Sequence, residues 1–306
     1  MAVSGSRGSM QDEDRERSGT PTDPRCPPEA GALVHGMTDT SLGPLHYVRA
    51  GSGAPLVLLH GGFGSWRHWE ANIAALAERH TVLALDLPGF GGSCDAPPDS
   101  SIEQLARPVA QAIASLCAGL PPGLRNVPPG IAAFSFGTAV AATIARLDPT
   151  SVRALLLVNP PGLGPVSAEV KAIQARAADA ARASGLRAGL EITLRELMVH
   201  NPALATPAAL DLLEDCVRQA RFVSRPLSRA VQLRPVLAAL PMPVQVALGE
   251  NDPHQRHELV ERHAWLTKAL GPDRVSVVGA CGHWLQYEQA ARFNALAAEF
   301  FSEPLP

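Results

Sequence analysis

A serine at a predicted strand-to-helix turn is the first residue in the chain whose setting suggests chemistry. The apolar run 131–134 ends at Ser135, and a helical pattern of small residues follows over 138–145. A sharp turn of this kind holds its central residue at positive φ, lifts the side chain clear of the sheet, and needs small residues two positions before and after. Ala133 and Gly137 meet that need. The pattern predicts a nucleophile elbow with alanine where glycine is usual; the alternative is a buried serine that caps the helix.

An acid and a base follow two later predicted strands. Asp252 comes after the apolar run 244–248, and His283 comes after 274–278. Catalytic groups of open parallel sheets lie on loops at the carboxyl ends of strands, so these residues are expected to meet Ser135 at one edge. His283 would act as base and then as acid, because a serine hydroxyl needs a base to become a good nucleophile. Asp252 would hold the imidazole in the required tautomer.

Backbone groups are predicted to form an oxyanion hole beside the serine. The strand 56–59 runs into His60-Gly61-Gly62-Phe63, and the glycines let the backbone approach a substrate closely. The N–H of Phe136 is free at the start of the predicted helix. We expect it to act with an N–H of the Gly62–Phe63 turn.

Two other residues offer alternatives to the roles assigned above. Glu250 lies two positions before Asp252 and could be the acid in its place. Cys281 lies beside the histidine loop, but a nucleophilic role for this cysteine would leave Ser135 unexplained.

Two clusters of charged residues are predicted to be solvated surfaces. The first lacks the i, i+4 histidine pair of a zinc-binding helix. Its members are His254, His257, Glu258 and Glu261. The second is a set of arginines, one of which could instead point into a pocket and bind an anionic substrate. Its members are Arg218, Arg221, Arg225 and Arg229. No metal site and no cofactor are expected.

Strand and helix patterns alternate along most of the chain. Apolar runs predict strands at 32–35, 45–50, 56–59, 81–85, 131–134, 152–158, 244–248 and 274–278. Helical spacing predicts helices at 66–79, 102–116, 254–270 and 285–300. Such alternation implies an α/β fold with a mostly parallel, doubly wound sheet, in which the first two strands form an antiparallel pair.

One long stretch breaks the alternation. From 166 to about 240 only helical patterns occur, interrupted by glycine and proline. A plain crossover usually needs one helix, so we predict an inserted helical cap over residues 161–240 of a single domain spanning 31–306. Residues 1–30 are polar, lack the apolar segment of a secretory signal, and are predicted to be a disordered tail.

Composition limits the partners and the setting. The 306-residue chain is 46% hydrophobic and has a net charge of −3, with acids and bases mixed, which favours neither a nucleic-acid nor a membrane partner. Five scattered cysteines without a C-x-x-C pair predict a reducing, cytoplasmic setting. A small-molecule substrate is the expected partner, and a homodimer stays open.

The chain resembles the α/β-hydrolases over about residues 32–302. The resemblance is carried by His60-Gly61-Gly62, Asp86-Leu87-Pro88-Gly89-Phe90-Gly91, Ala133-Phe134-Ser135-Phe136-Gly137, Gly249-x-x-Asp252 and Gly282-His283. It implies the α/β-hydrolase fold, a cofactor-free triad of serine, histidine and aspartate, and a supporting role for His60 rather than service as a second base.

Two stretches are similar to the meta-cleavage-product hydrolases, which split a carbon–carbon bond in vinylogous 1,5-diketone acids. They are Pro161-Gly162-Leu163-Gly164-Pro165 and Cys281-Gly282-His283-Trp284-Leu285-Gln286-Tyr287-Glu288. Those enzymes carry a Gly-Pro-Gly turn where this chain has Phe63-Gly64-Ser65. They also carry a cap arginine for the substrate carboxylate, and an ungapped comparison places Leu213 at that position.

An apolar residue at 213 favours a neutral carbonyl substrate. We therefore predict a serine hydrolase that cleaves a carboxylic ester or similar acyl bond, with carbon–carbon hydrolysis as the alternative. A non-catalytic ligand-binding role is less favoured because the chain keeps all three triad residues. Lactonase, amidase and haloperoxidase-like activities use the same triad and remain open, because fold alone does not settle the reaction.

Overall fold

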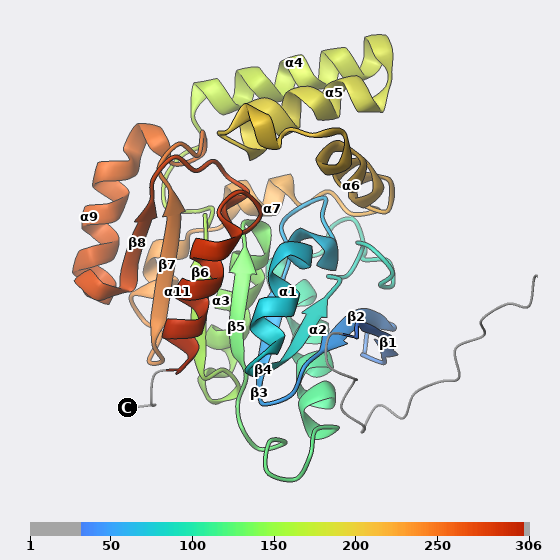
Figure 1. The fold of residues 1–306 in the computed structure, drawn as a ribbon, viewed down its shortest axis with the longest axis vertical. Helices are drawn as coiled ribbons and strands as arrows, with labels where there is room; N and C mark the ends of the chain where they lie inside the picture. Colours follow the sequence, from blue (N-terminus) through green and yellow to red (C-terminus); the bar gives the residue numbers. More distant parts are fainter. Residues whose placement is uncertain (1–31, 303–306) are drawn as a thin grey trace, which may run out of the picture.

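An eight-stranded sheet forms the centre of the molecule in a computed structural model that describes residues 32–302 (Figure 1). The tail predicted over residues 1–30 lies outside the described residues. The strands are β1 (Val34–Thr38), β2 (Leu45–Ala50), β3 (Ala54–Leu59), β4 (His80–Leu85), β5 (Gly130–Phe134), β6 (Ala154–Val158), β7 (Val244–Gly249) and β8 (Val275–Val278). Their order across the sheet is β1-β2-β4-β3-β5-β6-β7-β8.

All neighbouring strands from β4 to β8 run parallel, whereas β2 is antiparallel to both β1 and β4. The sheet is therefore mostly parallel, as the alternation of strand and helix patterns predicted. β1 lies a few residues later than predicted because its pairing with β2 runs from Val34 opposite Arg49 to Thr38 opposite Leu45.

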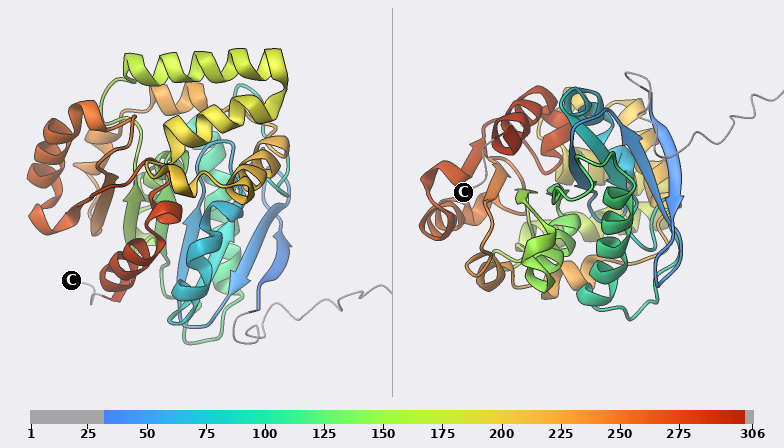
Figure 2. Two further views of the ribbon diagram at one scale, coloured as in Figure 1. Left: turned by 45° about the horizontal axis from the view of Figure 1, so that its top comes forward. Right: turned by 90° about the horizontal axis from the view of Figure 1, so that it is seen from below.

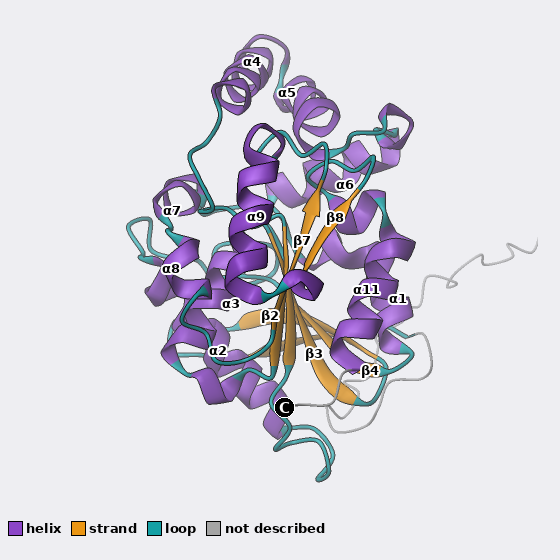
Figure 3. Ribbon diagram, turned by 90° about the vertical axis from the view of Figure 1, so that its left-hand side faces the viewer, coloured by secondary structure: helices purple, strands orange, loops and turns teal. Residues whose placement is uncertain are grey.

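Helices cover both faces of the sheet (Figure 3). The α-helices are α1 (Glu70–Ala77), α2 (Ile102–Ala118), α3 (Phe136–Leu147), α4 (Ala168–Ser184), α5 (Leu186–Thr193), α6 (Pro207–Arg218), α7 (Arg225–Ala230), α8 (Leu233–Leu237), α9 (Leu259–Leu270), α10 (Leu285–Glu288) and α11 (Ala290–Ser302). Short 3₁₀ turns occur at Trp66–Trp69, Pro149–Ser151, Pro202–Leu204, Arg256–Glu258 and Pro272–Arg274, and a π-helical turn at Leu194–Met198. Helices α2, α3, α8 and α9 lie on one face, and α1 and α11 lie on the other.

Each central strand supplies residues to two apolar cores. Val57 and Leu59 of β3 point into the core shared with α2 and α3, whereas Leu56 and Leu58 point into the core shared with α1 and α11. This follows from the period of two along a strand. Because both faces of the sheet are buried, its strands have the continuous apolar sequences that identified them.

Two predicted helices have different boundaries in the structure. The helix predicted over 254–270 begins at Leu259, because the chain first turns around Asp252, whose backbone carbonyl accepts hydrogen bonds from the N–H groups of Gln255 and Arg256. The helix predicted over 285–300 is two helices, α10 and α11, that meet at Gln289.

The segment between β6 and β7 holds only helical elements in the described chain. Figure 2 shows α4 and α5 side by side across the end of the sheet where the parallel strands terminate, with α6 beside them. The last helix, α8, packs instead against α3, and its Leu233 and Leu237 belong to the same core as β6 and β7. The segment is thus anchored in the main body at its carboxyl end.

Candidate active site

Ser135 occupies the sharp turn between β5 and α3. Its φ of 47° lies in the left-handed region, and its N–H donates a hydrogen bond of 2.9 Å to the carbonyl of Val158 in β6. Gly137 has no room for a side chain, since a Cβ there would lie 2.5 Å from the carbonyl oxygen of His60. Residue 137 must therefore be small because it packs against the backbone at the end of β3. From the sequence, we expected it to be small because of crowding with residue 133.

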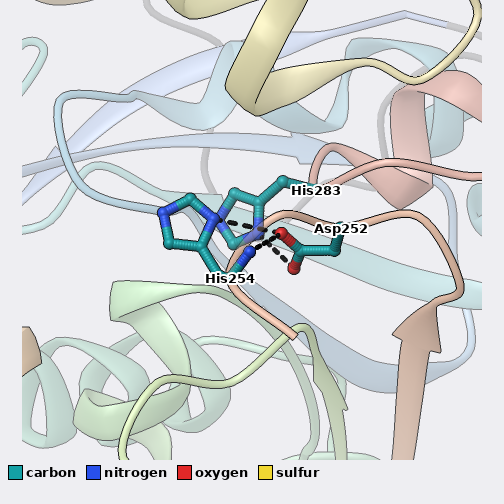
Figure 4. Close-up of side chains that lie close together, drawn as sticks. All are labelled: Asp252, His254 and His283. Atoms are coloured by element: carbon teal, nitrogen blue, oxygen red, sulfur yellow. Dashed lines mark hydrogen bonds and ion pairs between the residues drawn. The ribbon is translucent and has the colours of Figure 1, made fainter. Parts of the chain in front are cut away.

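Ser135, His283 and Asp252 form a hydrogen-bonded series. His283 Nε2 lies 3.0 Å from Ser135 Oγ, and His283 Nδ1 lies 2.7 Å from Asp252 Oδ2. Asp252 is fully buried and His283 is 7% exposed (Figure 4 shows the two facing each other). With the ring proton on Nδ1, donated to Asp252, Nε2 is free to accept the hydroxyl proton of Ser135.

The charges of the series suit a neutral imidazole beside an ionised carboxylate. Burial alone would raise the pKa of Asp252, but His283 and His254 outweigh it and hold that pKa well below its ordinary value. Burial lowers the pKa of His283, and Asp252 opposes that effect only in part. Asp252 is therefore ionised and His283 unprotonated at neutral pH, which is the state a general base needs.

The depressed pKa of His283 predicts a specific pH dependence of kcat/KM for any reaction in which this ring is the base. Activity should hold as the pH falls to 6.5, the ordinary histidine value, and should be lost only below it, as the ring becomes protonated. A pH profile of kcat/KM with a non-ionising substrate measures the midpoint. A midpoint above 6.5 would contradict the description of the ring as a desolvated base.

Two backbone N–H groups lie free beside the serine. Phe136 is the first residue of α3, so its N–H has no acceptor within the helix, and Phe63 has a φ of 56° in the turn after β3. Neither N–H donates a hydrogen bond within residues 32–302. Both residues line the same cavity as Ser135. These are the groups that the sequence assigned to an oxyanion hole.

Close packing leaves little room for side chains at the glycines of that turn. A Cβ on Gly61 would lie 2.9 Å from the ring of Phe134, and one on Gly62 would lie 2.3 Å from Ser224 Oγ. Separations under 3.0 Å are not tolerated without a shift of the neighbour. The absence of side chains at Gly61 and Gly62 therefore lets their backbone lie close to Ser135 and Phe136.

Asn159 links the acid loop to the base loop, and no motif in the sequence pointed to it. It follows β6, is buried, and has a φ of 45°. Its amide donates hydrogen bonds to the carbonyls of His283 at 2.8 Å and Gly282 at 3.3 Å, and its oxygen accepts one from the N–H of Gly249 at 2.8 Å. Asn159 thus fixes the end of β7, which leads to Asp252, relative to the backbone that carries the base.

His254 corrects one prediction from sequence. It does not belong to a solvated face but lines the cavity, where its N–H and Nδ1 lie 2.8 and 3.0 Å from Asp252 Oδ1 (Figure 4). Its ring centre lies 4.4 Å from that of His283. His257, from the same predicted cluster, is 55% exposed and pairs with Glu169. Asp252, His254 and His283 are the residues in the described chain whose grouping could hold a metal ion.

The alternative acid and the alternative nucleophile have other surroundings. Glu250 accepts a hydrogen bond from the N–H of Ala280 at 3.2 Å and does not contact the imidazole of His283. Cys281 is fully buried, and burial raises the pKa of its thiol, so the reactive thiolate is disfavoured.

Two buried histidines near the serine have different environments. His60 Nε2 accepts the N–H of Leu87 at 2.9 Å, and Nδ1 lies 2.7 Å from the carbonyl of Gly61, so both ring nitrogens are used in holding the loop. His68 lines the cavity, and neither of its ring nitrogens has a partner within residues 32–302. Burial lowers the pKa of His68, so it is a neutral part of the wall.

A cavity of about 440 Å³ opens above Ser135 and is covered by the helices between β6 and β7. Its wall is largely apolar and includes Ala177, Leu190, Leu197, Leu213 and Val217. Leu213, the residue that the ungapped comparison aligned with a carboxylate-binding arginine, is 4% exposed and does line this cavity.

The arginines between α6 and α8 divide into two pairs. Arg218 binds Glu214 and Arg221 binds Asp95, both on the surface as predicted. The other pair, Arg225 and Arg229, lines the cavity, which is the alternative that the sequence left open.

Arg225 is the more distinctive of the two cavity arginines. Its guanidinium carbon lies 5.0 Å from the centre of the Phe63 ring. Partial burial and the charge of Arg229 lower its pKa. Arg225 therefore places a cation, beside that of Arg229, in the wall of a largely apolar cavity.

The sheet order, the insertion after β6 and a serine at a strained strand-to-helix turn define the class of the α/β-hydrolases. The chain belongs to the alpha/beta hydrolase family, whose model matches residues 56–296. The predicted fold and the predicted resemblance are thereby confirmed. None of the helices in residues 32–302 is long and apolar enough to cross a lipid bilayer.

Curated relatives and solved structures include two kinds of hydrolase. The chain is 26% identical over 266 residues to 2-hydroxymuconate semialdehyde hydrolase of Pseudomonas sp. (strain CF600), covering 83% of this chain and 89% of the relative. It is 27% identical over 275 residues to 2-hydroxy-6-oxo-6-phenylhexa-2,4-dienoate hydrolase of Comamonas testosteroni, covering 85% and 91%. The carboxylesterase CesB of Bacillus subtilis has a similar structure, with a TM-score of 0.69, 17% identity, and coverage of 89% and 92%.

Proposed function

We propose that the protein is a serine hydrolase that cleaves carboxylic esters, or similar acyl bonds, of small molecules. The observation that carries the proposal is the series Ser135–His283–Asp252, with contacts of 3.0 and 2.7 Å, at the floor of a mainly apolar cavity. Membership of the alpha/beta hydrolase family supports hydrolysis as the reaction type.

In the proposed mechanism Ser135 Oγ attacks the substrate carbonyl while His283 Nε2 takes its proton. The N–H groups of Phe136 and of the Gly62–Phe63 turn stabilise the negative charge on the carbonyl oxygen. His283 then gives the proton to the leaving alcohol, and a water attacks the acyl-serine by the same route. Asp252 keeps the Nδ1 proton in place and stabilises the imidazolium that forms.

We propose that the helices α4 to α7 act as the cap that the sequence predicted and that they select the substrate. Their contribution to the cavity wall supports this role, since Ala177, Leu190 and Leu213 come from three of them. Apolar side chains there favour a neutral acyl group of small to medium size.

A second candidate function is hydrolysis of a carbon–carbon bond in a vinylogous diketone acid. Two observations favour it: the two curated relatives described above are named for substrates of that kind, and Arg225 places a cation at the cavity edge. In residues 32–302 no carboxylate forms an ion pair with Arg225. A substrate carboxylate could therefore bind there, although Leu213 occupies the aligned arginine position.

The two candidates predict opposite substrate preferences. With Leu213 in the wall, we expect neutral esters to be cleaved with a higher kcat/KM than vinylogous diketone acids, because a carboxylate entering the cavity loses hydration. Leu213→Arg should reduce the ratio of the two kcat/KM values by roughly 10- to 150-fold, which is the effect expected of one charge-assisted hydrogen bond to the substrate carboxylate. A panel of p-nitrophenyl esters compared with one such acid measures both effects.

Leu213→Met is the matched control, because it nearly conserves volume and adds no charge. Thermal melting of each variant separates altered specificity from loss of fold. If the wild type prefers the acid by tenfold or more, and Arg225→Gln removes that preference, the ester proposal is wrong and the second candidate replaces it.

A further inference from the structure

One carboxylate and two imidazoles converge beside the proposed catalytic serine. Asp252 presents Oδ2 to His283 Nδ1 at 2.7 Å and Oδ1 to His254 Nδ1 at 3.0 Å. One donor atom from each of the three residues lies within 4.8 Å of the other two. Figure 4 shows both rings facing the same carboxylate. The proposed mechanism uses only one of the two rings, so His254 calls for a separate account.

His254 supplies the third donor of this group and is also the residue through which the group reaches the cavity. Its side chain is 28% exposed and lines the cavity, whereas Asp252 is fully buried and His283 is 7% exposed. An ion that enters the cavity would reach the carboxylate past the ring of His254. The buried cation Arg262 donates to the carbonyl of His254 and is itself paired with Glu258 at 2.7 Å, so its charge is offset.

We propose that Asp252, His254 and His283 form an inhibitory binding site for a divalent transition metal, with Zn²⁺ as the best match. Two imidazoles and a carboxylate with a fourth position left open are a ligand set that zinc commonly takes. A triad with a single imidazole would offer only two ligands. The binding step does not depend on the reaction proposed above; only the inhibitory consequence rests on that proposed function.

The side chains must rotate to accept the ion. Zinc–nitrogen bonds are about 2.0–2.1 Å, so tetrahedral donors lie roughly 3.3 Å apart. The two imidazole nitrogens face different oxygens of Asp252, at 2.7 and 3.0 Å, and one donor atom from each residue lies within 4.8 Å of the other two. Side-chain rotation alone can therefore bring one oxygen and both nitrogens around the ion. A site with one charged oxygen ligand and two neutral nitrogen ligands also suits zinc better than calcium or magnesium, which prefer oxygen ligands.

Metal binding would disable the base through its tautomer. Zn²⁺ would bind His283 at Nδ1 and displace the proton from that nitrogen. The neutral ring would then carry its proton on Nε2, which receives it through water. A protonated Nε2 cannot accept the hydroxyl proton of Ser135, from which it lies 3.0 Å. The serine then stays unactivated.

Isothermal titration of the full chain with Zn²⁺ tests the binding. We expect one ion to bind the wild type and Ser135→Ala alike, since the serine is not a ligand. His254→Phe keeps an aromatic ring against His283 but removes a ligand, and should weaken binding by at least tenfold, since loss of an outer partner of a ligand already costs about 10- to 100-fold. His257→Phe, on the exposed neighbouring turn, is the matched control and should bind as the wild type does.

The rate at which a fluorophosphonate labels Ser135 tests the inhibition. Zn²⁺ should slow the labelling of the wild type and of His257→Phe. At the same Zn²⁺ concentrations, His254→Phe should be labelled at its own metal-free rate. Mg²⁺ should slow the labelling of none of the three proteins. Equal zinc affinity in the wild type and His254→Phe would overturn the site. Zinc binding that leaves wild-type labelling unchanged would overturn the inhibitory role. Absence of labelling without metal would instead count against the proposed function, while the titration would still decide the site.

Discussion

Replacing Ser135 with alanine is expected to lower kcat by about 10⁴- to 10⁶-fold while the protein remains folded. The hydroxyl is the proposed nucleophile, and among residues 32–302 its polar partner is His283 Nε2 at 3.0 Å, so its loss removes the covalent step without leaving a large cavity. The turn itself depends on the backbone, through the hydrogen bond from the N–H of residue 135 to Val158. Steady-state kinetics with a neutral ester and circular dichroism provide the two measurements.

Ser151→Ala is the matched control for that experiment, because this serine lies before β6 at the opposite end of the sheet and bonds only locally to the carbonyl of Asp148. It should leave kcat unchanged. If Ser135→Ala kept activity near that of the wild type, the serine-hydrolase proposal would fail, and Ser135 would be a structural turn residue.

Replacing Asp252 with asparagine should lower kcat by roughly 10⁴-fold, since the imidazole then loses the carboxylate that fixes its tautomer and stabilises its charged form. The effect has an additional cause in this chain. One carboxylate oxygen already accepts the N–H of His254 at 2.8 Å, so an asparagine oxygen that keeps this bond turns its NH₂ group toward His283 Nδ1. That ring would then carry its proton on Nε2 and could not act as the base.

Glu250→Gln is the control that distinguishes the two candidate acids. Because Glu250 bonds to the N–H of Ala280 and not to the imidazole, we expect its amide variant to stay within a few-fold of the wild-type kcat. The kinetics of both variants with the same ester decide the matter. A larger loss in Glu250→Gln than in Asp252→Asn would move the acid to position 250.

The fold and the positions of Ser135, Asp252 and His283 at strand ends were predictable because they depend on local sequence patterns. Buried parallel strands are continuous apolar runs. Where such a run ends at Ser135 and an alanine-rich helix follows, the sequence predicts a sharp strand-to-helix turn at that serine. Parallel strands also end at a common edge, so residues that follow β5, β7 and β8 meet even though they lie far apart in sequence. Asp252 and His283 could be placed together on that ground alone.

The residues that the sequence did not reveal act through contacts between loops. Asn159 precedes a Pro-Pro-Gly sequence and belongs to no catalytic motif, and only the structure places its amide against the loops that carry Gly249 and His283. The prediction for His254 rested on helical spacing, but the chain is not helical at this residue. Its partners are Asp252, two positions earlier, and the ring of His283, which follows another strand. A search for i, i+4 pairs cannot detect ligands that come from two loops.

The loop that carries His283 is held from two sides, which limits the changes that this architecture can accept. Asn159, just before the helical insertion, donates hydrogen bonds to the carbonyls of Gly282 and His283. The insertion holds the same loop, because the carbonyl of Met198 accepts the N–H of Trp284 at 2.7 Å, and Glu288 accepts N–H groups from both His200 and Gly282. A different insertion grafted between residue 160 and α8 would therefore have to reproduce these contacts to keep His283 beside Ser135. The inserted helices and the base loop form one mechanical unit, so neither can be redesigned without the other.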